Sequence, residues 1–322
     1  MRSAAKHSGL EPAGGGARVL ITGGAGFVGS ALTRLLQSGE TPCEILAPGA
    51  AQIDIRDAAA LEELVRSFRP TAIVHLAAIA APEEAKASPR LAWDVNLGGT
   101  MNLAEAVLKH APQARFVFAG SSEAYGVSFN RVAGAVTEDV ALRPLNVYAA
   151  TKAAADLMLG QMMKDGLRAI RFRPFNHTGP GQTDKFVVPA FARQVAEAAC
   201  GRREPVVHVG NLDAERDFID VRDVVRAYQI AAVGPELPAQ SDKVYNLAGG
   251  KTVRIGWILE RLIDLSGAKM DVKVDPARLR ANEVPTASGD ASAALAELGW
   301  KPEIPFDATL ADVYEFWRKG LA

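Results

Sequence analysis

The 322-residue chain has only two cysteines, and this absence excludes several classes of protein. Cys43 and Cys200 stand far apart without metal-ligand spacing, so we expect neither a disulfide framework nor a structural zinc site, and we expect no other bound metal. A reducing, cytoplasmic location fits this cysteine usage. The charge is balanced, with 36 basic and 37 acidic residues, so no nucleic-acid or membrane-surface partner is expected.

Long apolar runs are also missing. No stretch approaches the roughly 18 uncharged apolar residues that a membrane-spanning helix requires. Residues 1–17 contain three consecutive glycines and no continuous apolar segment, so they resemble neither a secretory signal nor a transmembrane helix, and we expect a flexible tail. The chain does have 48% hydrophobic residues, which suffices for a substantial core in one large α/β domain or in two unequal ones.

Short apolar runs alternate with helical patterns through the first half of the chain. The expected strands are residues 18–21, 44–47, 72–76, 115–119 and 169–172, and the helices between them include 30–37, 58–68, 95–110 and 149–164. This alternation predicts a Rossmann-type, doubly wound parallel sheet that binds ligands at the carboxyl ends of its strands. We assign residues 18–175 to this dinucleotide-binding domain.

Beyond residue 175, prolines divide the pattern into shorter pieces. We assign residues 176–322 mainly to a smaller lobe that binds the substrate, with a strand near 243–248 returning to the main sheet. The smaller lobe is expected to hold helices at 255–266, 291–298 and 309–317, with Trp257, Trp300 and Trp317 in its core.

A glycine-rich turn follows the first expected strand. It reads Gly23-Gly24-Ala25-Gly26-Phe27-Val28-Gly29 and opens a helix. In this position Gly24, Gly26 and Gly29 would supply the tight turn, the close backbone approach to a pyrophosphate and the helix-to-strand contact. The helix N-terminus would then face the phosphates. A merely flexible loop is the alternative, but the strand-to-helix context favours a dinucleotide site.

Three side chains further along could carry proton chemistry. Tyr148 and Lys152 lie four residues apart, so on one helix they share a face. We predict that the Lys152 ammonium lowers the pKa of the Tyr148 phenol and makes it a usable proton donor. Ser121 follows the expected strand 115–119 and would hold a carbonyl oxygen while Tyr148 protonates it. The alternatives are a chance surface pair and a serine-rich turn.

These segments together resemble the extended short-chain dehydrogenase/reductase family. The resemblance runs from residue 19 to about 317 and includes Gly23-x-x-Gly26-x-x-Gly29, Ser121 before Tyr125, and Tyr148-x-x-x-Lys152 in that order. It implies that Ser121, Tyr148 and Lys152 form the catalytic triad, with Lys152 also binding the nicotinamide ribose. The cofactor contacts that it implies, beyond Tyr148 and Lys152, are Gly23, Gly26, Phe27, Val28, Gly29, Asp54, Ile55, Leu76, Ala77, Ala78 and Asn96.

A narrower resemblance is to the GDP-4-dehydro-6-deoxy-D-mannose reductases, which form GDP-D-rhamnose. It rests on residues 120–126, 173–182 and 210–223. It implies a GDP-linked keto-deoxy sugar as substrate, with Arg216 and Arg278 on the diphosphate, because guanidinium groups bind phosphate oxygens bidentately. Ala281 stands where the related Leu-Arg-Pro pattern has proline. The substrate contacts implied are Ser122, Glu123, Asn176, Val188, Arg193, Arg216 and Arg278.

The cofactor and the assembly follow from weaker signals. The second expected strand, in residues 44–49, ends in Ala47-Pro48-Gly49, and this end carries neither the acid that favours NAD nor the arginine that favours NADP. Because a missing acid removes a repulsion against the 2′-phosphate, we expect NADP(H) to be preferred and NAD(H) to be tolerated. Helices 95–110 and 149–164 have enough apolar residues for two faces, and relatives commonly pair these helices, so we expect a homodimer.

Three functions remain open. The favoured one is reduction of the C4 keto group of GDP-4-dehydro-6-deoxy-D-mannose to GDP-D-rhamnose. The second is GDP-mannose 4,6-dehydratase, or another epimerase or dehydratase of the family, in which Glu123 acts as a catalytic base on the C5 proton. A dinucleotide sensor without turnover is disfavoured, because Ser121, Tyr148 and Lys152 are intact. His75 and His177 are interpreted as structural, since Tyr148 already supplies a proton.

Overall fold

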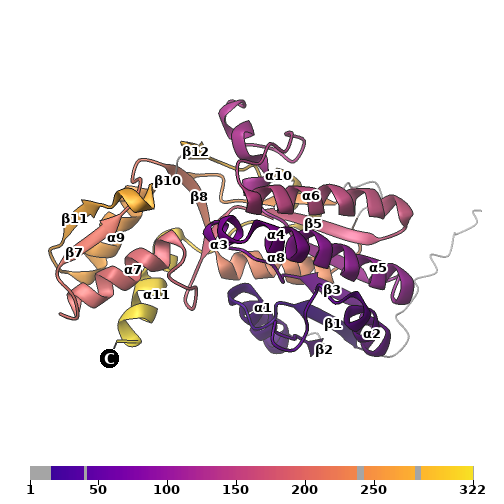
Figure 1. Cartoon of the computed structure of the whole chain (residues 1–322). Coiled ribbons are helices and arrows are strands. Elements are labelled where there is room, and N and C mark those ends of the chain that lie inside the picture. Colours follow the sequence, from indigo (N-terminus) through magenta and orange to yellow (C-terminus); the bar gives the residue numbers. More distant parts are fainter. Residues whose placement is uncertain (1–15, 40–41, 238–242, 280–283, 322) are drawn as a thin grey trace, which may run out of the picture.

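In the computed structural model, which describes residues 16–39, 42–237, 243–279 and 284–321, a six-stranded sheet forms the centre of the larger domain (Figure 1). The strand order is β2-β1-β3-β4-β5-β9, and every neighbouring pair is parallel. The predicted doubly wound parallel sheet is confirmed. The strands are β1 (Ala17–Thr22), β2 (Cys43–Leu46), β3 (Ala72–His75), β4 (Arg115–Ala119), β5 (Arg168–Pro174) and β9 (Val244–Leu247).

Helices cover both faces of this sheet because the buried strands are apolar on both sides. In β1, Val19 and Ile21 face one cluster and Leu20 faces the other. The first cluster is closed by α1 (Phe27–Ser38), α8 (Val221–Val233) and α10 (Ser292–Leu298). The second is closed by α2 (Ala58–Phe68), α5 (Thr100–His110) and α6 (Val147–Met162).

The smaller lobe has a core of its own, built on α7 (Val187–Ala199), α9 (Ile255–Ser266) and α11 (Phe306–Lys319). A two-stranded parallel sheet, β7 (Val206–Val209) with β11 (Asp271–Val274), covers part of it. A second sheet has the order β10-β8-β12, and β6 also pairs with β8. These strands are β6 (Asn176–Thr178), β8 (Glu215–Asp220), β10 (Thr252–Arg254) and β12 (Thr286–Ala287).

The chain crosses between the two lobes more often than the sequence pattern predicts. The prediction that residues 291–298 and Trp300 belong to the smaller lobe is wrong, because Ala294, Leu298 and Trp300 are buried in the core of the main sheet. Apolar periodicity shows that a helix is packed, but it does not show against which core. Trp257 and Trp317 do pack against the smaller lobe.

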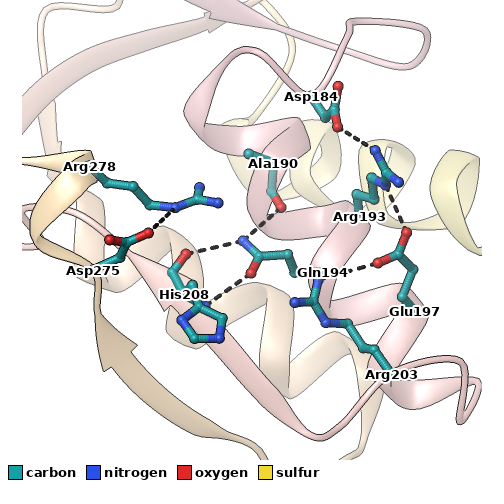
Figure 2. A pocket seen from close by; sticks show the side chains of 9 residues that line it. All are labelled: Asp184, Ala190, Arg193, Gln194, Glu197, Arg203, His208, Asp275 and Arg278. Atoms are coloured by element: carbon teal, nitrogen blue, oxygen red, sulfur yellow. Dashed lines mark hydrogen bonds and ion pairs between the residues drawn. The ribbon is translucent and has the colours of Figure 1, made fainter.

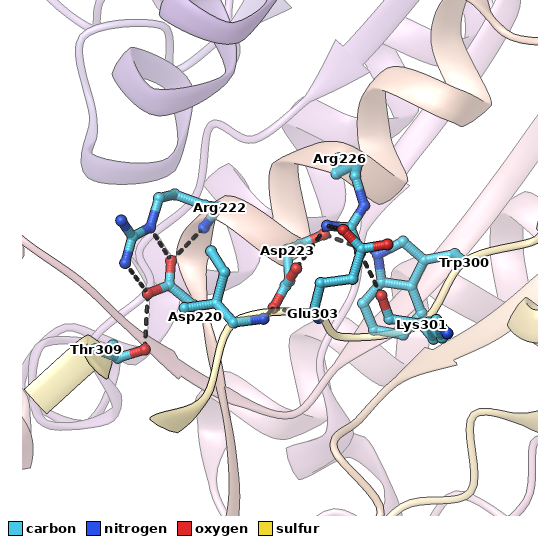
Figure 3. Close-up of polar contacts among 9 residues, drawn as sticks. Asp220, Arg222, Asp223, Arg226, Trp300, Lys301, Glu303 and Thr309 are labelled. Atoms are coloured by element: carbon cyan, nitrogen blue, oxygen red, sulfur yellow. Dashed lines mark hydrogen bonds and ion pairs between the residues drawn. The ribbon is translucent and has the colours of Figure 1, made fainter. Parts of the chain in front are cut away.

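Two buried carboxylates fix the junction between the lobes (Figure 3). Asp220 accepts a hydrogen bond from Thr309 Oγ1 of α11 at 2.7 Å. Asp223, in the first turn of α8, accepts from the backbone N–H of Glu303 at 3.1 Å, and its carbonyl oxygen accepts from Trp300 Nε1 at 2.8 Å. Both carboxylates have no exposed surface. The segment that leads into the smaller lobe is therefore tied to a helix of the main domain.

Some predictions fall partly or wholly outside the described residues. Residues 1–15 of the predicted tail and the unexpected Ala281 belong to this group, whereas Ala17 already lies in β1. Among the helices that the structure describes, none combines the length and the apolar character needed to cross a bilayer.

Candidate active site

The glycine-rich turn packs so closely that side chains would not fit. Gly23 has φ of +73°, and a Cβ at Gly24 would lie 2.4 Å from the carbonyl oxygen of Ala47. A Cβ at Gly29 would lie 2.3 Å from the carbonyl oxygen of Gly23. Helix α1 starts directly after Gly26, which caps it without a side-chain hydrogen bond. The bare backbone and the free first-turn N–H groups fit the pyrophosphate of a dinucleotide.

The other predicted cofactor residues lie in the segments that follow β2 and β3 and at the start of α1. Ala77 follows β3 and lies against Gly23. The Asp54 carboxylate is exposed and pairs with Arg56 at 2.5 Å, and this hydrogen-bonded guanidinium lowers the pKa of Asp54 to about 2. Ile55 is buried beneath Gly99. Leu76 and Ala78 flank Ala77, while Phe27 and Val28 begin α1 and pack partly against the main core.

Asn96 is almost fully buried, and its amide is occupied by protein groups. Its Oδ1 accepts from the Ile79 N–H at 2.8 Å, and its Nδ2 donates to the Ile79 carbonyl at 3.1 Å and to Thr151 Oγ1 at 2.9 Å. The side chain therefore holds the loop after β3 against α6. It supports this loop without offering a free amide to a ligand.

The structure brings Ser121, Glu123 and Tyr148 together. Helix α6 begins at Val147 because Asn146 caps it, with Oδ1 accepting from the Ala149 N–H at 2.8 Å. The other end of the same amide, Nδ2, donates to Glu123 Oε2 at 2.9 Å. Ser121 is buried, and its Oγ accepts from the Glu123 N–H at 3.1 Å. Asn146, which no sequence motif indicated, thus joins the start of α6 to the segment after β4.

The electrostatics of Tyr148 differ from the prediction. Burial raises the pKa of its phenol, the charge of Glu123 raises it further, and a hydrogen bond with Ser121 lowers it. The prediction that Lys152 lowers this pKa is wrong. The Lys152 ammonium instead donates to the Ala119 carbonyl oxygen at 2.7 Å, at the end of β4. Spacing of four residues gives a shared helix face, but it does not fix where a long side chain ends.

Lys152 is itself strongly perturbed. Its side chain is 4% exposed, and burial lowers its pKa to about 8. The ammonium lies 5.0 Å from the centroid of the Phe118 ring, which provides a cation–π contact. A buried ammonium that donates to one carbonyl oxygen has further N–H groups with which it can donate to a ligand hydroxyl.

The two histidines have contacts typical of structural residues. His75 is 1% exposed, and its ring nitrogens lie 2.7 Å from Thr22 Oγ1 and 2.9 Å from Thr100 Oγ1. Burial, with a smaller effect of the nearby Lys152 charge, lowers the pKa of His75 to about 3, so it is neutral. His177 Nδ1 lies 3.0 Å from the Phe175 carbonyl oxygen, and burial lowers its pKa.

The smaller lobe holds a cavity of about 450 Å³ (Figure 2). Arg193 on α7 pairs in it with Asp184 at 2.5 Å and with Glu197 at 2.7 Å, and Arg278 pairs with Asp275 at 3.4 Å across from that helix. Two predicted substrate residues, Arg193 and Arg278, thus share one cavity. Its lining residues are Asp184, Ala190, Arg193, Gln194, Glu197, Arg203, His208, Asp275 and Arg278.

Sequence reasoning missed most of this lining. Ala190, Arg193, Gln194 and Glu197 recur at three- and four-residue spacing, which places them on one face of α7. This polar stripe on an otherwise apolar helix was the signal available in the sequence. His208 comes from the neighbouring β7, and no local pattern indicates it.

The remaining predicted substrate residues lie elsewhere among the residues described. Arg216 on β8 donates to the carbonyl oxygens of Glu215 at 2.8 Å and Pro285 at 3.1 Å. Val188 is 1% exposed in the core of the smaller lobe, so only its backbone is offered to a ligand. Asn176 is exposed on β6, and Ser122 is buried next to Ser121.

Comparison with known proteins agrees with this architecture. The model of the family described as GDP-mannose 4,6-dehydratase matches residues 48–313. This chain belongs to that family, within the extended short-chain dehydrogenases/reductases. The predicted family and the predicted enzyme class, an NAD(P)-dependent oxidoreductase, are therefore confirmed.

Individual relatives are similar along nearly the whole chain. The GDP-6-deoxy-D-mannose reductase of Pseudomonas aeruginosa is 33% identical over 303 residues, which cover 94% of this chain and 97% of the relative. The structure of RMD from the same organism, complexed with NADPH, matches with a TM-score of 0.84 at 31% identity, covering 94% of this chain and 99% of that one. The NAD complex of a Thermus thermophilus UDP-glucose 4-epimerase matches with a TM-score of 0.80 at 27% identity, covering 94% and 99%.

Proposed function

We propose that the chain reduces the C4 keto group of GDP-4-dehydro-6-deoxy-D-mannose to give GDP-D-rhamnose. The observation that carries this proposal is that Ser121, just after β4, lies close enough to Tyr148 at the start of α6 to affect the pKa of its phenol, while the glycine-rich turn stands at the end of β1, two strands from β4 in the same sheet. The similarity to a GDP-6-deoxy-D-mannose reductase supports the choice of substrate.

The chain's own residues supply the proton and the orientation. Ser121 donates a hydrogen bond to the keto oxygen and fixes its position, and Tyr148 transfers its phenolic proton to that oxygen. A bound reduced nicotinamide would supply the hydride to the carbonyl carbon. The Lys152 ammonium already donates to the Ala119 carbonyl oxygen at the end of β4, and it would also donate to a ribose hydroxyl. The cofactor side of the cleft is fixed by Asn96, which holds the loop after β3 on α6.

The smaller lobe would bind the nucleotide end of the substrate. Arg193, Arg203 and Arg278 line one cavity, and their guanidinium groups are matched to the oxygens of a diphosphate. Each of the pairs formed by Arg193 and Arg278 is partly exposed, so a diphosphate can compete with the carboxylates for these groups. Arg216 and the backbone of Val188 are proposed as further contacts at the edge of the lobe.

NADPH is the proposed cofactor. The loop that follows β2 starts with Ala47-Pro48-Gly49, which has no carboxylate to repel a 2′-phosphate. A site without this carboxylate could also bind NADH. The P. aeruginosa relative was solved with NADPH and the epimerase with NAD.

A second candidate is the 4,6-dehydratase, and one observation favours it. The Glu123 carboxylate is held by Asn146 and is close enough to Tyr148 to raise the pKa of that phenol. A fixed carboxylate at this place suits removal of a C5 proton from a bound sugar. The dehydratase reaction would consume no reduced cofactor overall.

Two incubations separate these functions. In the first, purified protein receives NADPH and the GDP-linked keto sugar; in the second it receives GDP-mannose and NADP⁺. Loss of NADPH absorbance in the first supports the reductase, whereas keto sugar formed in the second supports the dehydratase. Activity in neither would favour a sensor. Thermal shifts with GDP, UDP and dTDP test the choice of guanine.

We further propose that the chain forms a homodimer through one apolar face. On α4 (Pro89–Trp93), α5 and α6, Trp93 is 37% exposed, Met101 41% and Leu157 63%. A hollow of about 410 Å³ between these helices includes Trp93, Met101 and Met158 in its lining. Exposed apolar side chains clustered on neighbouring helices are typical of a protein interface.

A further inference from the structure

A buried polar network lies beneath the catalytic residues, and the proposed reaction gives it no role. Its centre is Arg173 on β5, which is 5% exposed. The Arg173 guanidinium donates from Nε to Asp156 Oδ2 at 2.8 Å and from Nη2 to Asp156 Oδ1 at 3.2 Å. Its Nη1 donates to the Tyr125 hydroxyl at 3.0 Å, and that hydroxyl donates to Asn246 Oδ1 at 2.7 Å.

The two partners of Arg173 belong to the two segments that carry the catalytic groups. Asp156 lies on α6 four residues after Lys152, so both face the sheet from the same side of the helix. Tyr125 lies four residues after Ser121, in the 3₁₀ segment η2 (Ser122–Asn130) that follows β4. A single guanidinium on β5 therefore contacts both segments.

The loop that joins these segments is attached to the same network. Arg173 Nη1 also donates to the Glu138 carbonyl oxygen at 2.9 Å. The Glu138 carboxylate accepts from the Asn246 N–H at 2.6 Å. The chain between Ser121 and Tyr148 is thus held at its start, in its middle and beyond its end by groups from β5 and β9.

Stability alone is a poor explanation for this arrangement. Removing a guanidinium and a carboxylate from water offsets much of their mutual attraction, so buried ion pairs contribute little net stability. What the planar fork of an arginine does provide is fixed geometry toward several partners at once. A misplacement of about 1 Å between reacting groups can cost about a hundredfold in rate.

We propose that Arg173 and Tyr125 are positioning residues that set the separation between the Ser121 hydroxyl and the Tyr148 phenol. The kinetic part of the test rests on the proposed carbonyl reduction, and the structural part does not. Tyr125→Phe is the main variant because it removes one buried hydroxyl and keeps the ring. Tyr245→Phe is the matched control, since Tyr245 is 1% exposed on β9 and its hydroxyl donates to Glu297 at 2.7 Å, away from both catalytic segments.

For Tyr125→Phe we expect kcat for the keto sugar to fall about tenfold or more, with KM within about twofold of wild type. Tyr245→Phe should leave both constants within about twofold, although the two variants lower the thermal midpoint comparably. Arg173→Lys, which keeps the charge but loses the fork, should lower kcat at least as much as Tyr125→Phe. Equal kcat for Tyr125→Phe and Tyr245→Phe would overturn the proposal.

Crystal structures of wild type and Tyr125→Phe provide the readout that does not need turnover. The separation between Ser121 Oγ and Tyr148 Oη should be longer in the variant than in wild type. An unchanged separation would overturn the positioning role even if kcat fell. If wild type does not reduce the keto sugar, the proposed function fails, and this comparison of separations still decides the inference.

Discussion

Tyr148 is subject to opposing influences from its neighbours. Burial and the carboxylate of Glu123 raise the pKa of the phenol, and the Ser121 hydroxyl lowers it. A raised pKa keeps the phenol protonated at neutral and mildly alkaline pH, where it can still give its proton to a forming alkoxide. These surroundings favour the direction in which Tyr148 acts as an acid, which is carbonyl reduction.

The variant Glu123→Gln tests how much the charge of Glu123 raises the pKa of the Tyr148 phenol. Removing the negative charge removes a cause that raises the pKa of Tyr148, so the phenol should lose its proton at a lower pH. The alkaline limb of kcat for keto-sugar reduction should therefore move to lower pH, while kcat at pH 7 changes by less than about tenfold. Formation of keto sugar from GDP-mannose, if wild type has it, should be abolished. An alkaline limb that does not move would contradict this electrostatic role.

The variant Lys152→Met tests how burial of the Lys152 ammonium changes the free energy of unfolding. The folded-state pKa of Lys152 is about 8, whereas the unfolded value is about 10.4, so between these values the unfolded chain binds more protons. The free energy of unfolding of wild type should therefore rise with pH across this window. Relative to Lys152→Met, wild type should gain on the order of 1 to 3 kcal/mol between pH 7 and pH 10.

Chemical denaturation at several pH values measures this difference. Lys164→Met is the control, because Lys164 is exposed just beyond the end of α6. It should leave the pH dependence of wild type unchanged. Identical pH profiles for wild type and Lys152→Met would show that the ammonium is not destabilised by burial.

At the scale of single elements, the turn between β1 and α1 depends on the absence of side chains. Gly24→Ala would place a Cβ 2.4 Å from the Ala47 carbonyl oxygen, so the turn must shift away from the end of β2. We expect the Kd for NADPH to rise by about tenfold or more, which corresponds to about 1.4 kcal/mol. Fluorescence titration measures it. Gly320→Ala, where the nearest atom would be 3.6 Å away, should bind like wild type, and equal binding by Gly24→Ala would contradict the prediction.

The apolar face on α4, α5 and α6 carries a prediction about assembly. Leu157→Glu places a charge on its most exposed apolar residue and should weaken a dimer at least about tenfold. Sedimentation velocity over a range of concentrations shows the change. Leu295→Glu is the control, because Leu295 is 52% exposed on α10, outside that face. A monomeric wild type, or a Leu157→Glu variant that dimerises normally, would exclude this interface.

Element positions were predicted well where the pattern is local. Residues 115–119 and 58–68 form a strand and a helix with the predicted bounds, because buried strands are short apolar runs and amphipathic helices repeat every three to four residues. The predicted helix 95–110 is instead a π-helical turn, η1 (Asp94–Gly99), followed by α5. Gly99 packs closely on Ile55 there, and a tertiary contact of this kind is not visible in the periodicity.

At the scale of the molecule, the parallel sheet follows from the alternation of strands and helices, but the assignment of distant segments to lobes does not. Helices α8 and α10 return to the main sheet through buried contacts that only the folded chain reveals. The candidate site could likewise be predicted only in part. Ser121 and Tyr148 were predicted from motifs, whereas the anchors Asn146 and Arg173 become visible only through their partners.

In the proposed reaction, Tyr148 in the main domain protonates a keto sugar whose nucleotide is held by the smaller lobe. The most direct test is the rate of NADPH oxidation with GDP-4-dehydro-6-deoxy-D-mannose, measured for wild type and Tyr148→Phe alongside the Kd of each for the substrate. We predict a fall in kcat by a factor on the order of hundreds or more, with substrate binding nearly unchanged. Turnover by Tyr148→Phe at the wild-type rate would contradict the account.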